Sequence, residues 1–367
     1  MANILLTNLC NLQCSYCFAA PFLSDPGNKQ QFLSLETFEK YLDFSDRSGL
    51  QQVRLMGGEP TLHPDFEKFV LLAQQRGKHV VVFTNGLMPS KALQALLDLP
   101  VSECSALVNI TPLDDKVYSG DQSWNVGAQG KAAQLKAERL SKTLSRLGLR
   151  AQLGYTIFQH GPLDLSWIVE IIDRAGCCRS IRLGMAQPAK NGNSFVHPKK
   201  YQQIGKQVAE FTQKAAKEGV TVELDCGFVR CMFSEEDMQT LKQSQAHIAW
   251  RCSPVIDFDW NGSAFPCFPL AEITRIEDGL SKTTQALRAQ FEKTLSYFRV
   301  CGIFPECSSC GLRITEKCSG GCLASTLRRM KDQAIRYQIP ARYAAEFFQY
   351  HEGTSHWSKD LNQPSLS

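Results

Sequence analysis

The 367-residue chain has the composition of an ordinary globular protein, long enough for two domains or for one large α/β barrel with an appendage. Its 40 Lys and Arg against 36 Asp and Glu give a formal charge of +4, too small and too dispersed to indicate a nucleic-acid or membrane partner. A secretory signal and a long apolar span are both absent from the sequence, which predicts a cytoplasmic protein. In a reducing cytosol, its fifteen cysteines indicate metal ligands rather than disulfides.

Short apolar strands alternate with amphipathic helices through the first half of the chain. The strands are predicted over residues 3–7, 52–58, 78–86, 104–114, 150–158 and 180–188. The helices are predicted over residues 34–49, 65–77, 89–99, 131–148 and 163–176. This alternation is typical of a parallel sheet with right-handed crossovers. Six strands predict an α/β fold with a partial (β/α)6 TIM-like barrel, whose chemistry lies at the carboxyl ends of the strands.

The pattern changes after a predicted helix over residues 197–218 and a strand over 219–225. Nine of the fifteen cysteines lie from Cys226 onward, among short segments with frequent Gly and Pro. Such a region is organised more readily by metal than by a large apolar core. We therefore predict a barrel, a cysteine-rich metal-binding domain, and a C-terminal helix with a polar tail, over residues 1–220, 221–330 and 331–367.

Cys10, Cys14 and Cys17 directly follow the first predicted strand with the spacing CxxxCxxC. Three thiolates match three corners of a four-iron cube and leave the fourth iron open to a small molecule. The residues alone also allow a zinc site completed by a distant ligand, or unrelated core cysteines. A second motif, GGEP at residues 57–60, ends the second strand, where its glycines can let the backbone approach a ligand and Glu59 can accept from an ammonium group.

Together these motifs resemble those of the radical S-adenosylmethionine (SAM) enzymes over roughly residues 1–195, with Tyr16 at the aromatic position of the cysteine motif. The resemblance implies that Cys10, Cys14 and Cys17 hold a 4Fe–4S cluster whose open iron chelates SAM. It places Gly57, Gly58 and Glu59 at the methionyl amine and the backbone around Tyr16 at the adenine. It also implies contacts to ribose, carboxylate or adenine from strand-end residues, for which turn and capping roles remain open: Thr84, Asn85, Asn109 and the residues around Leu183 and Met185.

A second group of cysteines has a Cx9Gx4C pattern around Gly262, which we interpret as a hairpin turn, followed by CxxC and CxxxC pairs seven residues apart. This combination resembles the SPASM domain, an auxiliary iron–sulfur module of radical SAM enzymes that act on peptides and proteins. The resemblance implies a first auxiliary cluster, for which Cys231 is preferred over Cys226, held by Cys231, Cys252, Cys267 and Cys322. It implies a second auxiliary cluster on Cys307, Cys310 and Cys318.

Two features of this region depart from the SPASM pattern. The middle gap has seven residues where the family has five, and the family's final downstream cysteine has no counterpart after Cys322. The last ligand of the second cluster is therefore open among Cys226, Cys231 and Cys301. A zinc ribbon is an alternative, with a single tetrahedral site on Cys252, Cys267, Cys307 and Cys310. The remaining cysteines are interpreted as small core residues, namely Cys104, Cys177 and Cys178.

The resemblance implies reductive cleavage of SAM to a 5′-deoxyadenosyl radical, which then removes hydrogen from a substrate carbon. We expect oxidative modification of a peptide or protein side chain, with a flavodoxin or ferredoxin as reducing partner. The alternatives are the same chemistry on a small metabolite, or a non-catalytic zinc or iron–sulfur binding protein. The pattern does not identify a catalytic base, and Phe268 stands where anaerobic sulfatase maturases have an aspartate, which disfavours that activity. Because the first strand begins by residue 3, we expect a peptide substrate to bind directly or on a separate carrier.

Overall fold

The computed structural model describes residues 1–23, 29–110, 131–161, 163–189, 192–253, 255–299 and 301–336. Its strands are β1 (Ala2–Leu5), β2 (Gln52–Met56), β3 (His79–Thr84), β4 (Cys104–Asn109), β5 (Ala151–Ile157), β6 (Ser180–Met185), β7 (Thr221–Leu224), β8 (His247–Ile248), β9 (Ile256–Phe258) and β10 (Ala264–Phe265). Its α-helices are α1 (Leu35–Arg47), α2 (Phe66–Gln75), α3 (Ser90–Leu97), α4 (Lys131–Leu147), α5 (Ser166–Ala175), α6 (Tyr201–Lys217), α7 (Glu235–Gln243), α8 (Thr284–Arg299), α9 (Gly311–Ile314) and α10 (Leu323–Arg336).

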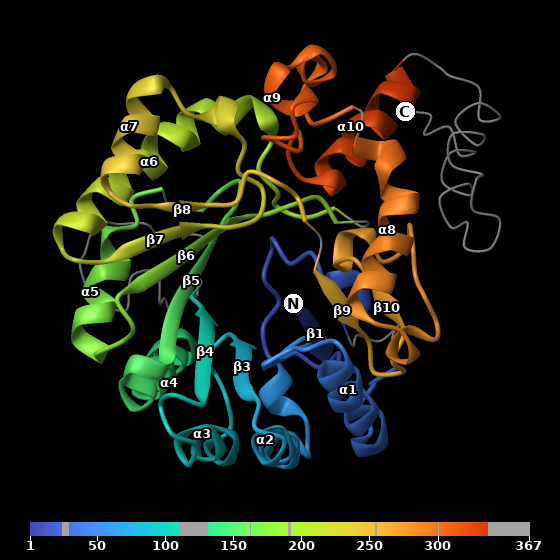
Figure 1. Cartoon of the computed structure of the whole chain (residues 1–367). Coiled ribbons are helices and arrows are strands. Elements are labelled where there is room, and N and C mark those ends of the chain that lie inside the picture. Colours follow the sequence, from blue (N-terminus) through green and yellow to red (C-terminus); the bar gives the residue numbers. More distant parts are fainter. Residues whose placement is uncertain are drawn as a thin grey trace.

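Within these ranges the strands form one open sheet in the order β10-β9-β1-β2-β3-β4-β5-β6-β7-β8. Neighbouring strands are parallel throughout, except that β9 and β10 form an antiparallel hairpin. Helices α1 to α5 lie outside the curved sheet, as Figure 1 shows. This arrangement confirms the predicted α/β partial barrel and brings the carboxyl ends of β1 to β7 to one edge.

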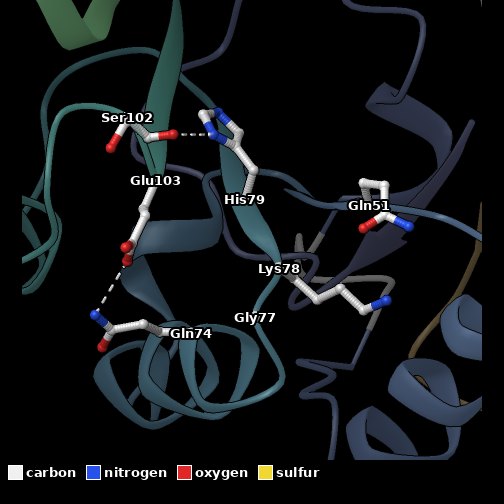
Figure 2. Close-up of a pocket in the computed structure, with 7 residues that line it drawn as sticks. All are labelled: Gln51, Gln74, Gly77, Lys78, His79, Ser102 and Glu103. Carbon is white, nitrogen blue, oxygen red and sulfur yellow. Dashed lines mark hydrogen bonds between the residues drawn. The ribbon is translucent and has the colours of Figure 1, made fainter.

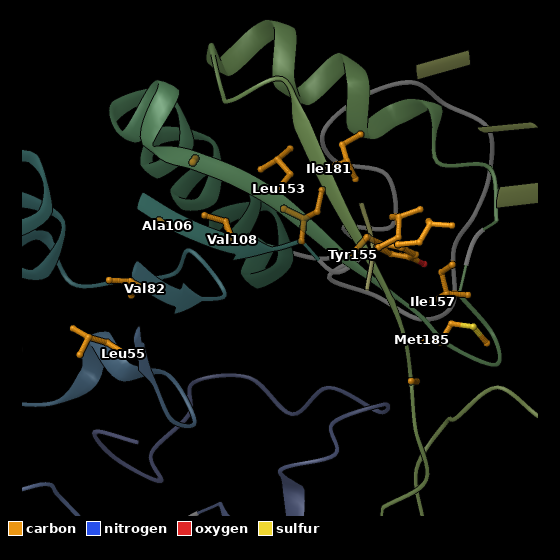
Figure 3. Packing of buried hydrophobic residues seen from close by; sticks show 14 of the residues in the cluster. Leu55, Val82, Ala106, Val108, Leu153, Tyr155, Ile157, Ile181 and Met185 are labelled. Atoms are coloured by element: carbon orange, nitrogen blue, oxygen red, sulfur yellow. The ribbon is translucent and has the colours of Figure 1, made fainter. Parts of the chain in front are cut away.

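The core lies between the sheet and the outer helices. Along β4 and β6, buried residues alternate with half-buried ones, as expected for strands with one face toward a packed layer. The buried set faces the helices and includes Leu55, Val82, Ala106, Val108, Leu153 and Ile181 (Figure 3). The opposite face, inside the curve of the sheet, carries half-buried and mostly polar side chains such as Asn109 and Arg182. One face of the sheet therefore forms the apolar core, and the other leaves polar side chains inside the curve of the sheet.

The sheet continues through the predicted domain boundary at residue 220. Strands β7 and β8 are added beside β6 at one side of the sheet. At the other side β9 pairs with β1, and Asn3 lies opposite Asp257. Phe258 of β9 packs edge-on against Phe44 of α1, with ring centroids 4.8 Å apart. The predicted hairpin turn at Gly262 is confirmed, because its φ of +83° is a conformation that glycine adopts without strain. The cysteine-rich segment is thus joined to the barrel by backbone pairing.

The C-terminal region is described as far as α10, which begins at Leu323 and contains the start of the predicted terminal helix. The remainder of that prediction, residues 337–367 with the polar tail, lies outside the described residues. None of the helices in the described ranges combines the length and apolar character needed to cross a bilayer.

Asp257 is a buried acid within the sheet, and we expect it to make stability depend on pH. Burial raises its pKa to about 7, although a hydrogen bond from Asn3 Nδ2 (2.6 Å) and the charge of Arg54 lower it. The folded state therefore keeps this proton between about pH 4 and pH 7 while the unfolded chain releases it. Stability from this group is fully present below the unfolded pKa and is lost as the pH rises through about 7, an effect of up to about 4 kcal/mol.

Urea unfolding at pH 5 and pH 8 tests this expectation. The wild-type chain should be less stable at pH 8, and Asp257→Asn, which keeps an acceptor for Asn3, should show a smaller difference between the two pH values. An equal difference in both proteins would contradict the assignment.

Candidate active site and auxiliary cysteine sets

The three N-terminal cysteines lie in the loop after β1, at the carboxyl edge of the sheet. Backbone hydrogen bonds fix this loop to the end of β2, because Gly58 N donates to Thr7 O (2.9 Å) and Glu59 N donates to Leu9 O (2.7 Å). A β carbon at Gly58 would lie 2.3 Å from Leu9 O and 3.1 Å from Cys10 Cβ. One at Gly57 would lie 2.4 Å from Thr7 O. The glycine pair therefore permits direct backbone contact between the two predicted motifs.

Cys10, Cys14 and Cys17 are each half-buried and interact electrostatically with one another. Cys17 N donates to Cys14 O (3.0 Å), which folds the CxxC part of the motif into a turn. Burial, together with the charges of Cys14 and Cys10, raises the pKa of Cys17 to about 11. Metal binding must therefore displace protons from these thiols. The donor set suits three irons of a cluster that leaves its fourth iron to another ligand.

Among the described residues, no three His, Cys, Asp or Glu side chains converge closely enough to hold a single metal ion. The thiolates around a four-iron cube are separated by the cube itself, so they stand farther apart than the ligands of one zinc ion.

Glu59 is fully buried and links the ends of β2 and β3. Its Oε1 accepts from Thr61 Oγ1 (2.5 Å) and Thr84 Oγ1 (2.8 Å), and its Oε2 accepts from Asn85 N (2.8 Å). Burial raises the pKa of Glu59, while these hydrogen bonds lower it. Because every partner is a donor, the site suits a carboxylate that positions the surrounding backbone. The predicted amine contact through this side chain stays a prediction, since its carboxylate is already engaged.

Tyr16 and Asn109, both predicted to border SAM, are brought together by the fold. Asn109 Nδ2 donates to the Tyr16 hydroxyl (2.9 Å), and the Tyr16 ring packs against Phe158 with centroids 4.9 Å apart. The side chains of Leu183 and Met185, by contrast, are buried on the helix-facing side of β6. A contact with a ligand at the inner face would have to use their backbone.

Two asparagines at this site were missed by sequence reasoning. Asn11 donates to Leu87 O (2.8 Å) and accepts from Asn85 Nδ2 (2.8 Å), which ties the cysteine loop to the end of β3. Asn193 Nδ2 donates to Tyr16 O (3.0 Å), and its segment after β6 holds the opposite side of the loop. Asn11 could have been found from its position between Cys10 and Cys14. Asn193 lies in a polar stretch whose sequence shows no periodicity and no motif.

The first set of later cysteines, as the structure groups them, is Cys226, Cys252, Cys267 and Cys322. Cys226 shares a side-chain hydrogen bond with Cys322, and this bond and burial together raise its pKa well above the ordinary value. Cys267 is half-buried and interacts electrostatically with Cys252 and Cys226. The structure thus brings Cys226 next to Cys322, where sequence analysis preferred Cys231. The ligands of the first auxiliary cluster stay a prediction.

The second set is Cys231, Cys307, Cys310 and Cys318. Burial raises the pKa of Cys231 to about 11, and the thiols of Cys307, Cys318 and Cys310 contribute to that rise. Gly320 N donates to Cys318 Sγ (3.4 Å), and a β carbon on Gly320 would lie 3.8 Å from Cys307 Sγ. Both sulfurs therefore lie beside Gly320. The four cysteines of the zinc-ribbon alternative are divided between the first and second sets. Of the other cysteines, Cys104 and Cys177 are buried as predicted, whereas Cys178 is half-buried.

A pocket of about 300 Å³ lies at the opposite edge of the sheet, where β3 begins (Figure 2). It is lined by Gln51, Gln74, Gly77, Lys78, His79, Ser102 and Glu103. His79 starts β3 and Thr84 ends it, so the length of the strand, roughly 17 Å, separates this pocket from the cysteine loop. Its position excludes it from the site described above.

The first part of the chain is similar in sequence to known proteins. Residues 4–116 match the model of the radical SAM superfamily. A GTP 3′,8-cyclase from Shewanella denitrificans is 33% identical over 176 residues, which cover 44% of this chain and 50% of that protein. The subtilosin biosynthesis protein AlbA from Bacillus subtilis is 22% identical over 217 residues, which cover 59% of this chain and 46% of AlbA. The chain thus spans half or less of the length of these curated relatives.

The fold is similar to that of Streptococcus suis SuiB bound to its precursor peptide SuiA, with a TM-score of 0.62 at 15% identity. This likeness covers 89% of the present chain and 72% of SuiB. Residues 4–116 are therefore similar to the radical SAM superfamily, whose members bind a 4Fe–4S cluster and S-adenosylmethionine.

Proposed function

We propose that the chain is a radical SAM enzyme that oxidatively modifies a side chain of a peptide or protein. When bound, a cluster and SAM would supply radical chemistry that can remove hydrogen from an unactivated carbon. Cys10, Cys14 and Cys17 hold the cluster in this proposal. Gly57 and Gly58 let the backbone beside Glu59 approach the methionyl group, and Tyr16 with Asn109 borders the nucleoside.

The inner face of the sheet suits the binding of a substrate beside that site. Its residues are half-buried and mostly polar, including Thr156, which donates to Asn109 Oδ1 (3.4 Å). Deeper along the sheet, Arg182 pairs with Asp225 (2.6 Å), and Arg54 stacks on the Phe83 ring with its guanidinium carbon 4.9 Å from the centroid. Such fixed polar groups can orient a substrate and hold its C–H bond close to the radical while excluding water.

The extent of the fold likeness carries the peptide assignment. The match to SuiB, whose structure holds a precursor peptide, covers 89% of the chain and so must include part of the cysteine-rich region. The match to the GTP cyclase covers 44%. We accordingly propose that residues 221–330 form a SPASM-type auxiliary module on a barrel of residues 1–220, followed by the terminal segment 331–367. A flavodoxin or ferredoxin is the proposed electron donor.

A small metabolite is the second candidate substrate class, because several curated relatives are GTP 3′,8-cyclases. Deuterium transfer separates the two classes. Anaerobically reconstituted protein, dithionite and SAM should yield 5′-deoxyadenosine, and this 5′-deoxyadenosine should contain deuterium when uniformly deuterated peptides are present. Transfer of deuterium to 5′-deoxyadenosine from deuterated GTP alone would favour a small metabolite as substrate. Colourless protein with bound zinc and no SAM cleavage would support a non-catalytic binding protein instead.

Tyr16→Phe should weaken SAM binding with little effect on turnover. The substitution removes the hydroxyl that accepts from Asn109 and keeps the ring contact with Phe158. Loss of one such hydrogen bond is worth about 1 kcal/mol, so the KM for SAM should rise roughly fivefold. The rate of 5′-deoxyadenosine formation as a function of SAM concentration measures both constants. A large fall in kcat at unchanged KM would contradict a binding role.

A further inference from the structure

Cys307, Cys310 and Cys318 of the second set need a fourth thiolate if they are to hold a 4Fe–4S cluster entirely by protein ligands. Cys307, Cys310 and Cys318 come from one short segment, and the sequence has no cysteine after Cys322. Among the 367 residues, the candidates for this thiolate therefore lie in an earlier part of the chain. Cys226 is already hydrogen-bonded to Cys322 in the first set.

Helix α6 holds both parts of the second set against one another. Cys231 lies in the short 3-10 helix η5 (Arg230–Met232). A β carbon on Gly205 of α6 would lie 2.1 Å from Met232 O, so η5 packs directly on the backbone of this helix. One turn earlier, the Tyr201 ring stands edge-on to Phe304, with centroids 5.9 Å apart. Phe304 O accepts from Cys307 N (3.1 Å), so the same helix face also positions the CxxC segment.

An independent chain of contacts brings Cys231 toward Cys318. Phe233, two residues after Cys231, packs edge-on against Trp250 with ring centroids 5.8 Å apart. Trp250 O in turn accepts from Ser319 N (3.2 Å), the residue after Cys318. The thiol of Cys231 interacts electrostatically with those of Cys307, Cys318 and Cys310. This interaction and the contacts of the neighbouring residues place Cys231 at the same set.

We propose that Cys231 is the fourth thiolate of the second set, so that η5 and the segment from Cys307 to Cys318 together hold one auxiliary 4Fe–4S cluster. This inference rests on the proposed function for the presence of auxiliary clusters. It replaces the downstream cysteine of the SPASM pattern with an upstream residue. The loop after β7 then gives one ligand to each set, Cys226 to the first and Cys231 to the second.

The shared loop has a mechanical consequence. Cys226 and Cys231 are five residues apart and directly follow β7, which pairs with β6 of the barrel. The two proposed clusters are therefore anchored to the same strand of the sheet that carries the radical site. Their positions relative to that site are set by backbone pairing rather than by a flexible linker.

Iron content and spectra of the full-length chain test the inference. After anaerobic reconstitution, wild-type protein should hold about twelve irons per chain, in three clusters. Cys231→Ala should lose between about one and four irons, and its electron paramagnetic resonance spectrum should lack or change one cluster signal. Cys301→Ala is the matched control, because Cys301 is a free cysteine that also reaches the surface in part, lies in the same region, and was a candidate for the same position. It should keep the wild-type iron content and spectrum.

Cys231→Ser gives a second readout that does not depend on losing the cluster. A serine oxygen can still ligate iron, so this variant should keep its iron with a shifted spectrum. Wild-type iron and spectra in both Cys231 variants, or loss of iron in Cys301→Ala instead, would overturn the inference.

Failure of the inference is distinguishable from failure of the proposed function. A wild-type chain with about four irons that cleaves SAM would overturn the second-set cluster and leave radical chemistry intact. Loss of iron in Cys231→Ala from a protein that cleaves no SAM would support the ligand and contradict the enzyme.

Discussion

Gly58→Ala is expected to remove the N-terminal cluster and to lower the rate of SAM cleavage about 100-fold or more. The added β carbon would lie 2.3 Å from Leu9 O and 2.7 Å from Leu9 C, which are backbone atoms that cannot rotate away. It would also lie 3.1 Å from Cys10 Cβ. Either the cysteine loop or the end of β2 must move, and a displacement of about 1 Å at reacting groups is enough for a loss of this size.

Quantifying 5′-deoxyadenosine, together with the spectrum of the reduced cluster, measures the effect of Gly58→Ala. Gly77→Ala is the matched control, because its φ of +64° makes alanine strained by about 1–2 kcal/mol while its β carbon would meet open space. It should lose a little stability and retain the cluster. Full SAM cleavage by Gly58→Ala would show that the contact between the two motifs has no functional consequence.

The barrel strands could be predicted because each is marked in the sequence by its own local pattern. Val80, Val82 and Ala106 lie where an apolar run with flanking turn residues places them, and the motifs at the ends of β1 and β2 meet because parallel strands share one edge. The later strands β8 and β10, of two residues each, are too short to produce any periodicity. Their place in the sheet is decided by tertiary packing. β10 pairs with β9, for example, and Phe258 of β9 packs against Phe44 of α1.

The grouping of the later cysteines depends on contacts that no spacing reveals. Cys226 and Cys231 are close in sequence and chemically identical, so a linear pattern gives no reason to assign them to different sets. The packing of Met232 on Gly205 holds the Cys231 segment against helix α6. The hydrogen bond of Cys226 with Cys322 holds Cys226 in the first set. The role of Asn193 is likewise set by a loop that only the fold brings to Tyr16.

Glu59→Gln is expected to lower the free energy of unfolding by about 2–3 kcal/mol. This loss should be seen in the protein without any ligand. The carboxylate accepts four hydrogen bonds in a fully buried position, from Thr61 N (3.3 Å), Thr61 Oγ1, Thr84 Oγ1 and Asn85 N. An amide replaces one acceptor by an NH2 group that must face donors. At least one buried donor is then left without an acceptor at the junction of β2 and β3.

The free energy of unfolding in urea and the KM for SAM should both be measured for Glu59→Gln. Glu103→Gln is the matched control, since Glu103 is half-buried at the other edge of the sheet and accepts from the Gln74 side chain (3.2 Å). It should change stability by less than about 0.5 kcal/mol. If Glu59 acted only as an open acceptor for the methionyl amine, Glu59→Gln would leave the free energy of unfolding unchanged and raise only the KM. Because Asn85 is hydrogen-bonded to both Glu59 and Asn11, we instead expect the loss of stability to extend to the cysteine loop.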